Sequence, residues 1–415
     1  MNKVQSNSVF KRKIFNDPVY GFITVSDDFI FQLIEHPYFQ RLRRIKQLGL
    51  THLVYPGSFH TRFHHAMGAM HLMGEAIESL RSKGNKITEE EAQAVNAAIL
   101  LHDIGHGPFS HALENCIVED INHEYLSQLF MERLNTQFGG KLQLAIDIFQ
   151  NKYSKKFLHQ LVSSQLDVDR LDYLKRDSFF TGVSEGVIST ERIIKMMNVV
   201  NDNLVIEAKG IYSIEKFIIA RRLMYWQVYL HKTVLSAGYL MIKILQRAKY
   251  LSEQGLSLFA TPAFHEFITH TYRKIDFDKN PQILDLFAEL DDFDIYSSIK
   301  VWSNSSDTIL ATLCKKLINR QLFHIDLEKT PIDELKMEKI KKEVIKTLNI
   351  SPSDIDYFVF SDKVENNAYD TSNININILF KDGKILDLAE ASDQLNISVL
   401  SQTVTKYFLC YPKEI

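Results

Sequence analysis

The stretch LLHDIGHGPFSH, residues 100–111, does most to decide the fold of this chain. It closes a segment, residues 89–101, whose apolar side chains recur at helical spacing. A glycine and a proline follow inside the stretch, and both are typical of the end of one helix and the start of the next. We therefore expect Asp103, next to His102, in the last turn of a helix. The helix dipole disfavours an anion at that end, and a bound cation would compensate for it.

Length and composition predict a cytoplasmic protein with a large domain and a smaller one. The chain has 415 residues, more than one core usually holds, and a formal net charge of −3. That charge gives no general attraction to nucleic acid or to a membrane. Three distant cysteines without a C-x-x-C pair fit a reducing compartment. The N-terminus lacks the apolar core of a signal peptide, and the apolar runs are too short to span a bilayer.

The pattern of apolar residues predicts a mainly α fold. Short strands around a turn are expected over residues 10–25, a hairpin over 201–210, and helices over 28–48, 63–80, 89–102, 109–116, 124–138 and 213–251. Strands are expected again over residues 355–360, 374–380, 384–386 and 404–410, with a hairpin turn at 381–384. We therefore expect a helical body, 1–300, with short N-terminal strands, and a small α+β region, 301–415, that takes part in oligomer contacts.

Side chains suited to one divalent ion occur along the helical body: His65, His102, Asp103 and Asp169. Imidazole and carboxylate ligands suit Mn, Fe, Zn or Ni. Fewer than six protein ligands leave positions for water and phosphate oxygens. Taken singly, His65 is more typical of a surface or core histidine, and Asp169 of a helix N-cap. Only their occurrence together, in this order, favours a metal site.

The order H…HD…D resembles that of the HD-domain phosphohydrolases. More closely, the chain is similar to the deoxynucleoside triphosphate (dNTP) triphosphohydrolases of the SAM-and-HD-domain type. The similar motifs are FQRLRRIKQLG, YPGSFHTRFHHAMGAM, LLHDIGHGPFSHALE, NHE and LDVDRLDYLKRDSFFTG. The resemblance runs from about residue 13 to the C-terminus and leaves no room ahead of it for a SAM domain. It implies a helical HD core with the four metal ligands above, and it places His65 rather than His64 among them.

The resemblance also implies how the phosphates are bound and cut. Cleavage of an anionic triphosphate needs positive charge around the phosphorus. Arg62 and His111 are implied to face the α-phosphate, and Arg170 and Arg221 the outer phosphates. His106, His123 and Glu124 are implied to form the acid–base unit that acts on water and on the 5′-oxygen. The implied reaction is hydrolysis of a dNTP to deoxynucleoside and inorganic triphosphate, with one divalent metal in the HD site (Mn, Fe, Zn, Ni or Mg) and Mg on the nucleotide.

Sugar recognition is implied for another group of residues. Gln47, Tyr173 and Asp177 match positions that hydrogen-bond the 3′-hydroxyl. Leu48 and Tyr229 match positions that pack against the 2′-carbon. A site closed on that carbon would reject ribonucleotides by a clash. Without the motif, the tyrosines would be typical of ordinary helix packing.

A second, activating nucleotide site follows from the same resemblance. The residues at the corresponding positions are Lys13, Ile14, Asn16, Glu35, Gln40, Arg43, Arg192, Lys232 and Arg320, with Glu35 where the family has Asp. The implied activator is GTP or a dNTP, bound between subunits of a homo-oligomer, a dimer or a tetramer. The alternative for Arg43 and Arg320 is a solvated face or a plain subunit contact.

Two other functions remain alternatives. An HD phosphohydrolase acting on nucleoside monophosphates or cyclic nucleotides would share the metal ligands but would not need Arg221 or Tyr229. A nucleotide sensor or nucleic-acid-binding oligomer would need no catalysis, and the intact ligand set disfavours it.

Overall fold

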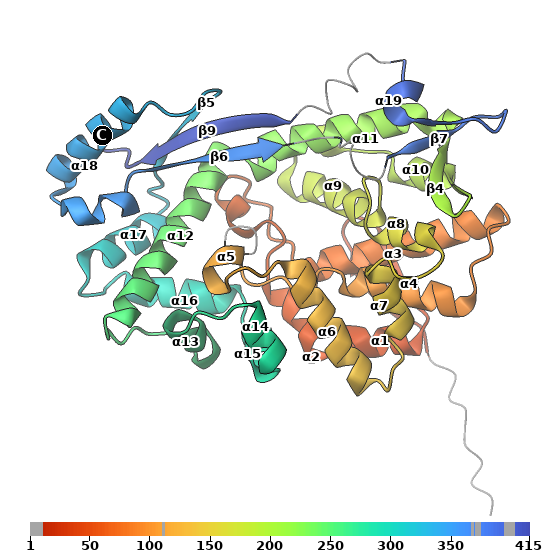
Figure 1. The fold of residues 1–415 in the computed structure, drawn as a ribbon, viewed down its shortest axis with the longest axis horizontal. Helices are drawn as coiled ribbons and strands as arrows, with labels where there is room; N and C mark the ends of the chain where they lie inside the picture. The colour runs from red at the N-terminus through yellow and green to blue at the C-terminus, as the bar shows by residue number, and fades with distance from the viewer. Residues whose placement is uncertain (1–10, 110–112, 367–368, 370–374, 394–402) are drawn as a thin grey trace, which may run out of the picture.

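The structure is a computed structural model that describes residues 11–109, 113–366, 369, 375–393 and 403–415. Helices dominate these residues, and the strands are short and lie mainly at the periphery (Figure 1). The predicted fold class, mainly α with short N-terminal strands, is therefore confirmed. Among the described residues, the helices are too short or too polar to cross a membrane.

The centre of the molecule is formed by α3 (Arg62–Ser82), α4 (Glu89–Leu101) and α9 (Val168–Thr181). Helix α3 packs against both of the others and buries apolar side chains along its whole length. Helix α4 begins where Thr88 and Glu91 form a capping box. Helix α9 begins at Asp167, whose side chain accepts the Arg170 backbone N–H, and ends at Gly182 in the left-handed conformation. The caps thus fix where each of these two helices starts.

The N-terminal part begins with a hairpin of β1 (Lys13–Asp17) and β2 (Gly21–Val25), as predicted. The helical pattern predicted over residues 28–48 is present, but it is divided into short pieces. The chain forms α1 (Asp28–Glu35), α2 (Pro37–Gln40) and two 3-10 turns, η1 (Arg41–Arg44) and η2 (Gly49–Leu53). The break falls at His36, which is extended because a proline follows it.

The long helix predicted over residues 213–251 is interrupted, and that prediction is wrong in this respect. Helix α11 (Ile211–Met224) passes into a π-helical turn, η5 (Tyr225–Tyr229), and α12 (Lys232–Glu253) starts anew after His231. The Tyr55 hydroxyl donates to the Gln227 carbonyl at 2.6 Å, which competes with the helical ladder. The turn aims Tyr225 and Tyr229 at the cavity described below.

Smaller helices surround this core. The body contains α5 (Glu114–Ile117), α6 (His123–Gln137), α7 (Gln143–Phe149), α8 (Lys156–Val162), η3 (Ser184–Gly186), α10 (Thr190–Met196), η4 (Ala208–Gly210), α13 (Pro262–Thr269), α14 (Lys274–Lys279), α15 (Gln282–Glu289) and α16 (Asp292–Trp302). The C-terminal region adds α17 (Thr308–Ile318), α18 (Glu334–Leu348), η6 (Pro352–Tyr357) and α19 (Leu388–Ala391). Helix α17 packs against α12 and α16.

One sheet joins the helical body to the C-terminal region. Strands β3 (Met197–Val200) and β4 (Asn203–Glu207) form a hairpin, which starts four residues earlier than predicted. Strand β7 (Asn377–Leu379) pairs in parallel with β4 and antiparallel with β8 (Ile385–Asp387). These strands lie together near α19 in Figure 1. The domain division at residue 300 stays a prediction, and this sheet crosses it.

A second sheet consists of β5 (His324–Glu328), β9 (Val404–Tyr411) and β6 (Phe360–Asn366), in that order. The strands predicted over residues 374–380, 384–386 and 404–410 are confirmed where the structure describes them. The strand predicted over residues 355–360 is wrong. Ser351 caps a turn that starts at Pro352, so the first half of that segment belongs to η6 and the strand begins only at Phe360.

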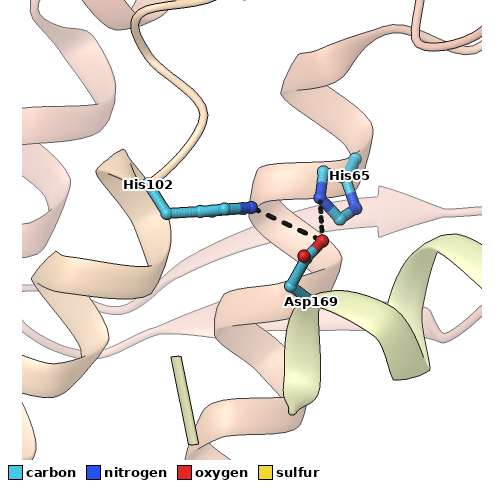
Figure 2. Close-up of side chains that lie close together, drawn as sticks. All are labelled: His65, His102 and Asp169. Atoms are coloured by element: carbon cyan, nitrogen blue, oxygen red, sulfur yellow. Dashed lines mark ion pairs between the residues drawn. The ribbon is translucent and has the colours of Figure 1, made fainter. Parts of the chain in front are cut away.

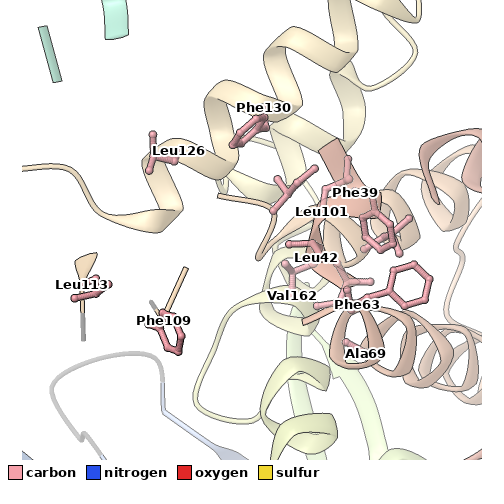
Figure 3. Packing of buried hydrophobic residues seen from close by; sticks show 14 of the residues in the cluster. Phe39, Leu42, Phe63, Ala69, Leu101, Phe109, Leu113, Leu126, Phe130 and Val162 are labelled. Atoms are coloured by element: carbon pink, nitrogen blue, oxygen red, sulfur yellow. The ribbon is translucent and has the colours of Figure 1, made fainter. Parts of the chain in front are cut away.

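Aromatic side chains contribute to the core beneath the site. Figure 3 shows Phe39 and Phe63 packed together, and their ring centroids are 5.3 Å apart. The fully buried Arg41 crosses this region and donates to the backbone oxygens of Ile104, at 2.7 Å, and Leu290, at 3.2 Å. It therefore anchors the loop that follows α4, which carries the chemistry described next.

Candidate active site

Three helices bring the predicted metal ligands together. His65 lies near the start of α3, His102 caps the end of α4, and Asp169 lies in the first turn of α9, where a helix favours an anion. Figure 2 shows both imidazole rings directed at the Asp169 carboxylate. Asp169 Oδ1 lies 3.1 Å from His65 Nε2 and 3.5 Å from His102 Nε2. Asp103 completes the group, 3.3 Å from His102 Nε2 and 3.8 Å from His65 Nε2.

The hydrogen bonds of the two histidines fix which ring nitrogen faces the centre. His65 Nδ1 lies 2.8 Å from Asp172 Oδ2, and His102 Nδ1 lies 2.6 Å from the Ile99 carbonyl. Both partners are acceptors, so each Nδ1 carries a proton and each Nε2 is the nitrogen that would offer its lone pair to a metal ion. Both Nε2 atoms are buried without a hydrogen-bond partner among the described residues. The ligand atoms of His65, His102 and Asp169 lie within 4.8 Å of one another, which fits a bound metal ion.

The charge balance of this cluster also fits a cation. Burial lowers the pKa of His65, but Asp169 and Asp172 outweigh it and raise the pKa to about 10. The surroundings of His65 therefore favour a second proton on its ring, and a metal ion at Nε2 would replace that proton. Burial raises the pKa of Asp103, but His102, His106 and Arg62 hold it well below its usual range.

The position of Asp103 requires one correction. Helix α4 ends at Leu101, so Asp103 lies in the turn beyond the helix rather than in its last turn. Arg62 Nη1 lies 2.5 Å from Asp103 Oδ2. The buried arginine therefore compensates the negative charge of Asp103. The helix dipole is not, by itself, a reason for a metal ion at this position.

His64 takes a different role from its neighbour His65. Its Nδ1 accepts the Thr61 backbone N–H at 3.1 Å, so the side chain caps the start of α3. His65, one residue further round the helix, is fully buried and points into the cluster.

The predicted acid–base residues lie beside the predicted metal ligands. The rings of His106 and His123 are stacked, with centroids 3.8 Å apart and planes 15° apart. His106 Nε2 lies 3.4 Å from Asp103 Oδ1. Burial, together with Arg62, lowers the pKa of His106 well below its usual value. Glu124 is exposed and lines the same cavity, whereas His111 lies outside the described residues.

A cavity of about 950 Å³ contains most of the predicted substrate residues. The predicted metal ligands His102, Asp103 and Asp169 line it, and His65 is not among its lining residues. The predicted substrate residues on its wall are Gln47, Leu48, Arg62, Arg170, Tyr173, Asp177 and Tyr229. Arg221 is half-buried near Tyr173 and is not among the lining residues.

Asp177 is held between two side chains in this cavity. His60 Nε2 lies 2.7 Å from Asp177 Oδ1, and the Tyr229 hydroxyl donates to Asp177 Oδ2 at 2.8 Å. The buried His60 ring is stacked on Phe180, with centroids 4.4 Å apart. His60 was not singled out from the sequence, because a lone histidine has no spacing that marks it. Asp172 was also missed, although its place one turn after Asp169 on the same helix is a usable signal.

The residues predicted to bind an activating nucleotide lie in several places. Six of them belong to the surface formed by β1, α1 and the turns after it: Lys13, Ile14, Asn16, Glu35, Gln40 and Arg43. There the Arg43 Nε atom donates to Gln40 Oε1 at 2.8 Å, and the guanidinium lies over the Phe63 ring. The others lie elsewhere: Arg192 on α10, Lys232 at the start of α12, and Arg320 after α17.

Comparison with known proteins identifies the family. The HD domain matches residues 62–177, and the HD associated region matches residues 188–253. YwfO of Bacillus subtilis, an uncharacterised protein, is 33% identical over 98% of this chain and 93% of its own length. The crystal structure of a phosphohydrolase from Bacteroides thetaiotaomicron is 53% identical, with a TM-score of 0.94 over 97% of this chain and 100% of that one.

A further relative has a named activity. The deoxynucleoside triphosphate triphosphohydrolase SAMHD1 homologue of Dictyostelium discoideum is 30% identical over 68% of this chain, which covers 58% of that protein. With the matched HD region ending at Asp177 and containing every predicted metal ligand, the class is clear. The chain belongs to the HD-domain phosphohydrolases and is homologous to the dNTP triphosphohydrolases of the SAMHD1 type.

Proposed function

We propose that this hydrolase converts dNTPs to deoxynucleoside and inorganic triphosphate. The observation that carries the proposal is the placement of Asp177 and Tyr229 in the same cavity as His102, Asp103 and Asp169. A sugar-binding group beside a phosphate-cleaving group is what a nucleotide hydrolase requires. The Dictyostelium relative carries this activity in its name.

The sugar end of the cavity supports a deoxyribose. Gln47 Oε1 is buried without a hydrogen-bond partner among the described residues, so it can accept a bond from a 3′-hydroxyl. Asp177, held by His60 and Tyr229, provides a second acceptor. The rings of Tyr173 and Tyr229 meet edge to face, with centroids 6.1 Å apart. Tyr173 would hydrogen-bond the 3′-hydroxyl, whereas Tyr229 and Leu48 would form the wall against the 2′-carbon. A 2′-hydroxyl would clash with that wall.

The phosphate end provides the charge for cleavage. His65, His102, Asp103 and Asp169 would hold one divalent ion, which when bound supplies a Lewis acid for the phosphoryl oxygens. Their nitrogen and oxygen donors suit Mn, Fe, Zn or Ni more than Mg, which we place on the nucleotide.

Two arginines of the cavity wall are already oriented by carboxylates. Arg62 contacts Asp103, and Arg170 contacts Asp167, the N-cap of α9. We assign them to the α-phosphate and to the outer phosphates, respectively. The stacked His106 and His123, with Glu124 beside them, handle the proton of the attacking water and that of the 5′-oxygen.

The assay that tests the proposal gives the purified protein each dNTP with Mn²⁺ or Mg²⁺ and separates the products by chromatography. Parallel reactions with added GTP or dGTP test activation. Nucleoside monophosphates and cyclic nucleotides serve as alternative substrates. We expect deoxynucleoside and triphosphate from dNTPs. Release of monophosphate and pyrophosphate, or turnover of only the alternative substrates, would contradict the proposal.

A further inference from the structure

A line of buried charged side chains leads from the N-terminal hairpin to His65. Asp17 at the end of β1, and Arg176 and Asp172 on α9, make up this buried charge line. Arg176 Nη1 donates to Asp17 Oδ2 at 2.8 Å. Arg176 also donates to both Asp172 oxygens, from Nε and from Nη2, at 2.9 Å each. Asp172 Oδ2 in turn accepts from His65 Nδ1 at 2.8 Å. Asp17 is 6% exposed, and the other three are fully buried.

The backbone of α3 is shaped to admit this line. A Cβ atom on Gly68 would lie 2.1 Å from Arg176 Nη2 and 2.1 Å from Asp172 Oδ1. Such a distance is far inside van der Waals contact. Gly68 lies one turn after His65, so the ion pair is pressed directly against the helix that carries the metal ligand.

Each link restricts the next one. Two parallel hydrogen bonds from a planar guanidinium fix the plane of the Asp172 carboxylate. That carboxylate fixes the ring orientation of His65 and keeps its proton on Nδ1, so that Nε2 faces the metal cluster. The bond to Asp17 occupies the remaining terminal nitrogen of Arg176 and prevents rotation of the fork.

Asp17 is also part of the hairpin turn. Its Oδ1 accepts the backbone N–H groups of Val19 at 2.9 Å and Tyr20 at 3.0 Å. One carboxylate thus holds both the turn between β1 and β2 and the arginine that orients Asp172. A displacement of the hairpin would therefore be transmitted to the metal ligand.

We propose that Asp17, Arg176 and Asp172 are positioning residues for His65, and that they couple the N-terminal hairpin to the affinity of the metal site. The inference rests on the proposed metal site but not on the identity of the substrate. Its test therefore measures metal binding rather than turnover.

The experiment strips the protein with a chelator and measures the dissociation constant for Mn²⁺ by competition with a chromogenic chelator. Asp172→Asn should weaken Mn²⁺ binding by about tenfold or more, the usual effect of losing a carboxylate behind a metal-bound histidine. Asp17→Asn keeps an oxygen for the hairpin turn but places an amide NH2 group, which cannot accept a hydrogen bond, opposite Arg176; because Arg176 keeps its two bonds to Asp172, a smaller loss in the same direction is expected. Arg176→Lys should retain more affinity than Arg176→Met.

The matched control is Asp307→Asn. Asp307 Oδ2 accepts from Arg247 Nη2 at 2.6 Å, and its Oδ1 caps α17, so it combines an ion pair and a backbone cap as Asp17 does. It lines no part of the cavity, and the variant should bind Mn²⁺ like the wild type. The visible absorption of the Co²⁺-loaded proteins adds a signature of ligand geometry, which should change in Asp172→Asn and not in the control.

Thermal unfolding of the metal-free proteins checks that each variant folds. If Asp172→Asn does not fold, Asp17→Asn is the variant that tests the inference. Wild-type Mn²⁺ affinity and an unchanged Co²⁺ spectrum in the folded variants would overturn this inference but not the proposed metal site. A wild-type protein that binds no Mn²⁺ would overturn the proposed metal site and the inference with it. Loss of affinity without dNTP turnover would support the inference while contradicting the proposed substrate.

Discussion

At the scale of single residues, the site depends on which atom of each side chain faces its centre. His65 and His102 are both fixed through Nδ1, one by a carboxylate and one by a backbone carbonyl. Asp169 lies opposite both Nε2 atoms. The sequence predicts these three residues, because the order of histidine and aspartate is recognisable. It does not predict the groups that orient them, because such contacts join positions far apart in the chain.

Asp169→Ala should abolish stoichiometric metal binding, because it removes the carboxylate that lies near the Nε2 atoms of both His65 and His102. Elemental analysis of the purified protein measures this directly. Glu191→Ala, which removes an acidic residue from the first turn of α10, should leave the metal content unchanged. A metal content equal to that of the wild type in Asp169→Ala would refute the assignment.

A second prediction separates the two roles of Tyr229. Tyr229→Ala removes the wall against the 2′-carbon and should raise the ratio of GTP to dGTP hydrolysis by about tenfold or more. Tyr229→Phe removes only the hydroxyl that donates to Asp177, so the steric selection should persist. Steady-state rates with both nucleotides provide the ratio. Equal ratios in the wild type and Tyr229→Ala would rule out the steric explanation.

At the scale of elements, the ends of helices position the side chains of the candidate site. Each predicted metal ligand lies at or near the end of a helix. Helix α6, which carries His123 and Glu124 in its first turn, is placed by Gly105. A Cβ atom on Gly105 would lie 2.3 Å from the His123 carbonyl oxygen and 2.3 Å from the Ser127 nitrogen.

A third prediction follows from this contact. Gly105→Ala should push α6 away from the loop, destabilise the fold by about 1–3 kcal/mol, and greatly reduce turnover. Gly74→Ala is the matched control, because a Cβ atom there meets nothing within 4 Å inside α3. It should stabilise the protein by about 0.5–1 kcal/mol. Chemical denaturation and turnover rates measure both variants, and wild-type turnover in Gly105→Ala would contradict the account.

The start of α4 gives a prediction about pH. Burial raises the pKa of Glu91, but bonds from Lys155, Tyr153 and the Thr88 backbone outweigh it and lower the pKa below its usual value. A lowered folded-state pKa stabilises the protein above the unfolded-state pKa, about 4.3, and this stabilisation is lost as the pH falls through the lowered value.

Glu91→Gln should therefore cost about 1–3 kcal/mol at pH 7, and the difference from the wild type should shrink at acid pH. Denaturant titrations at pH 7 and below pH 4 measure it. Glu89→Gln serves as the control, because its side chain is almost fully exposed. A constant difference between Glu91→Gln and the wild type across this range would contradict the prediction.

Some of these helices and strands can be predicted from the sequence, and others cannot. The amphipathic helices α3, α4 and α6 follow from local periodicity. The break after Tyr229 does not, because neither proline nor glycine marks it and a hydrogen bond from Tyr55 maintains it. The apolar run at residues 355–360 is short enough to fit a strand or a helical turn, and a proline ahead of it decides for the turn.

At the scale of the whole molecule, distant segments complete one structure. Strand β7 pairs with β4 in parallel across a long connection, and local sequence carries no signal for such pairing. The buried charge line likewise joins the first strand to a helix in the middle of the chain. The cavity draws its wall from residues 47–51, the turn after α4, one face of α9, η5 and α12, so that one substrate would span elements that only the complete fold brings together.

We propose that water cleaves the bond between the α-phosphorus and the 5′-oxygen of a dNTP. The most direct measurement is mass spectrometry of the products after turnover of each dNTP in oxygen-18 water, with Mn²⁺ and with or without GTP. The account predicts inorganic triphosphate that carries one heavy oxygen, together with an unlabelled deoxynucleoside. Heavy oxygen in the deoxynucleoside, or labelled monophosphate with pyrophosphate, would contradict it.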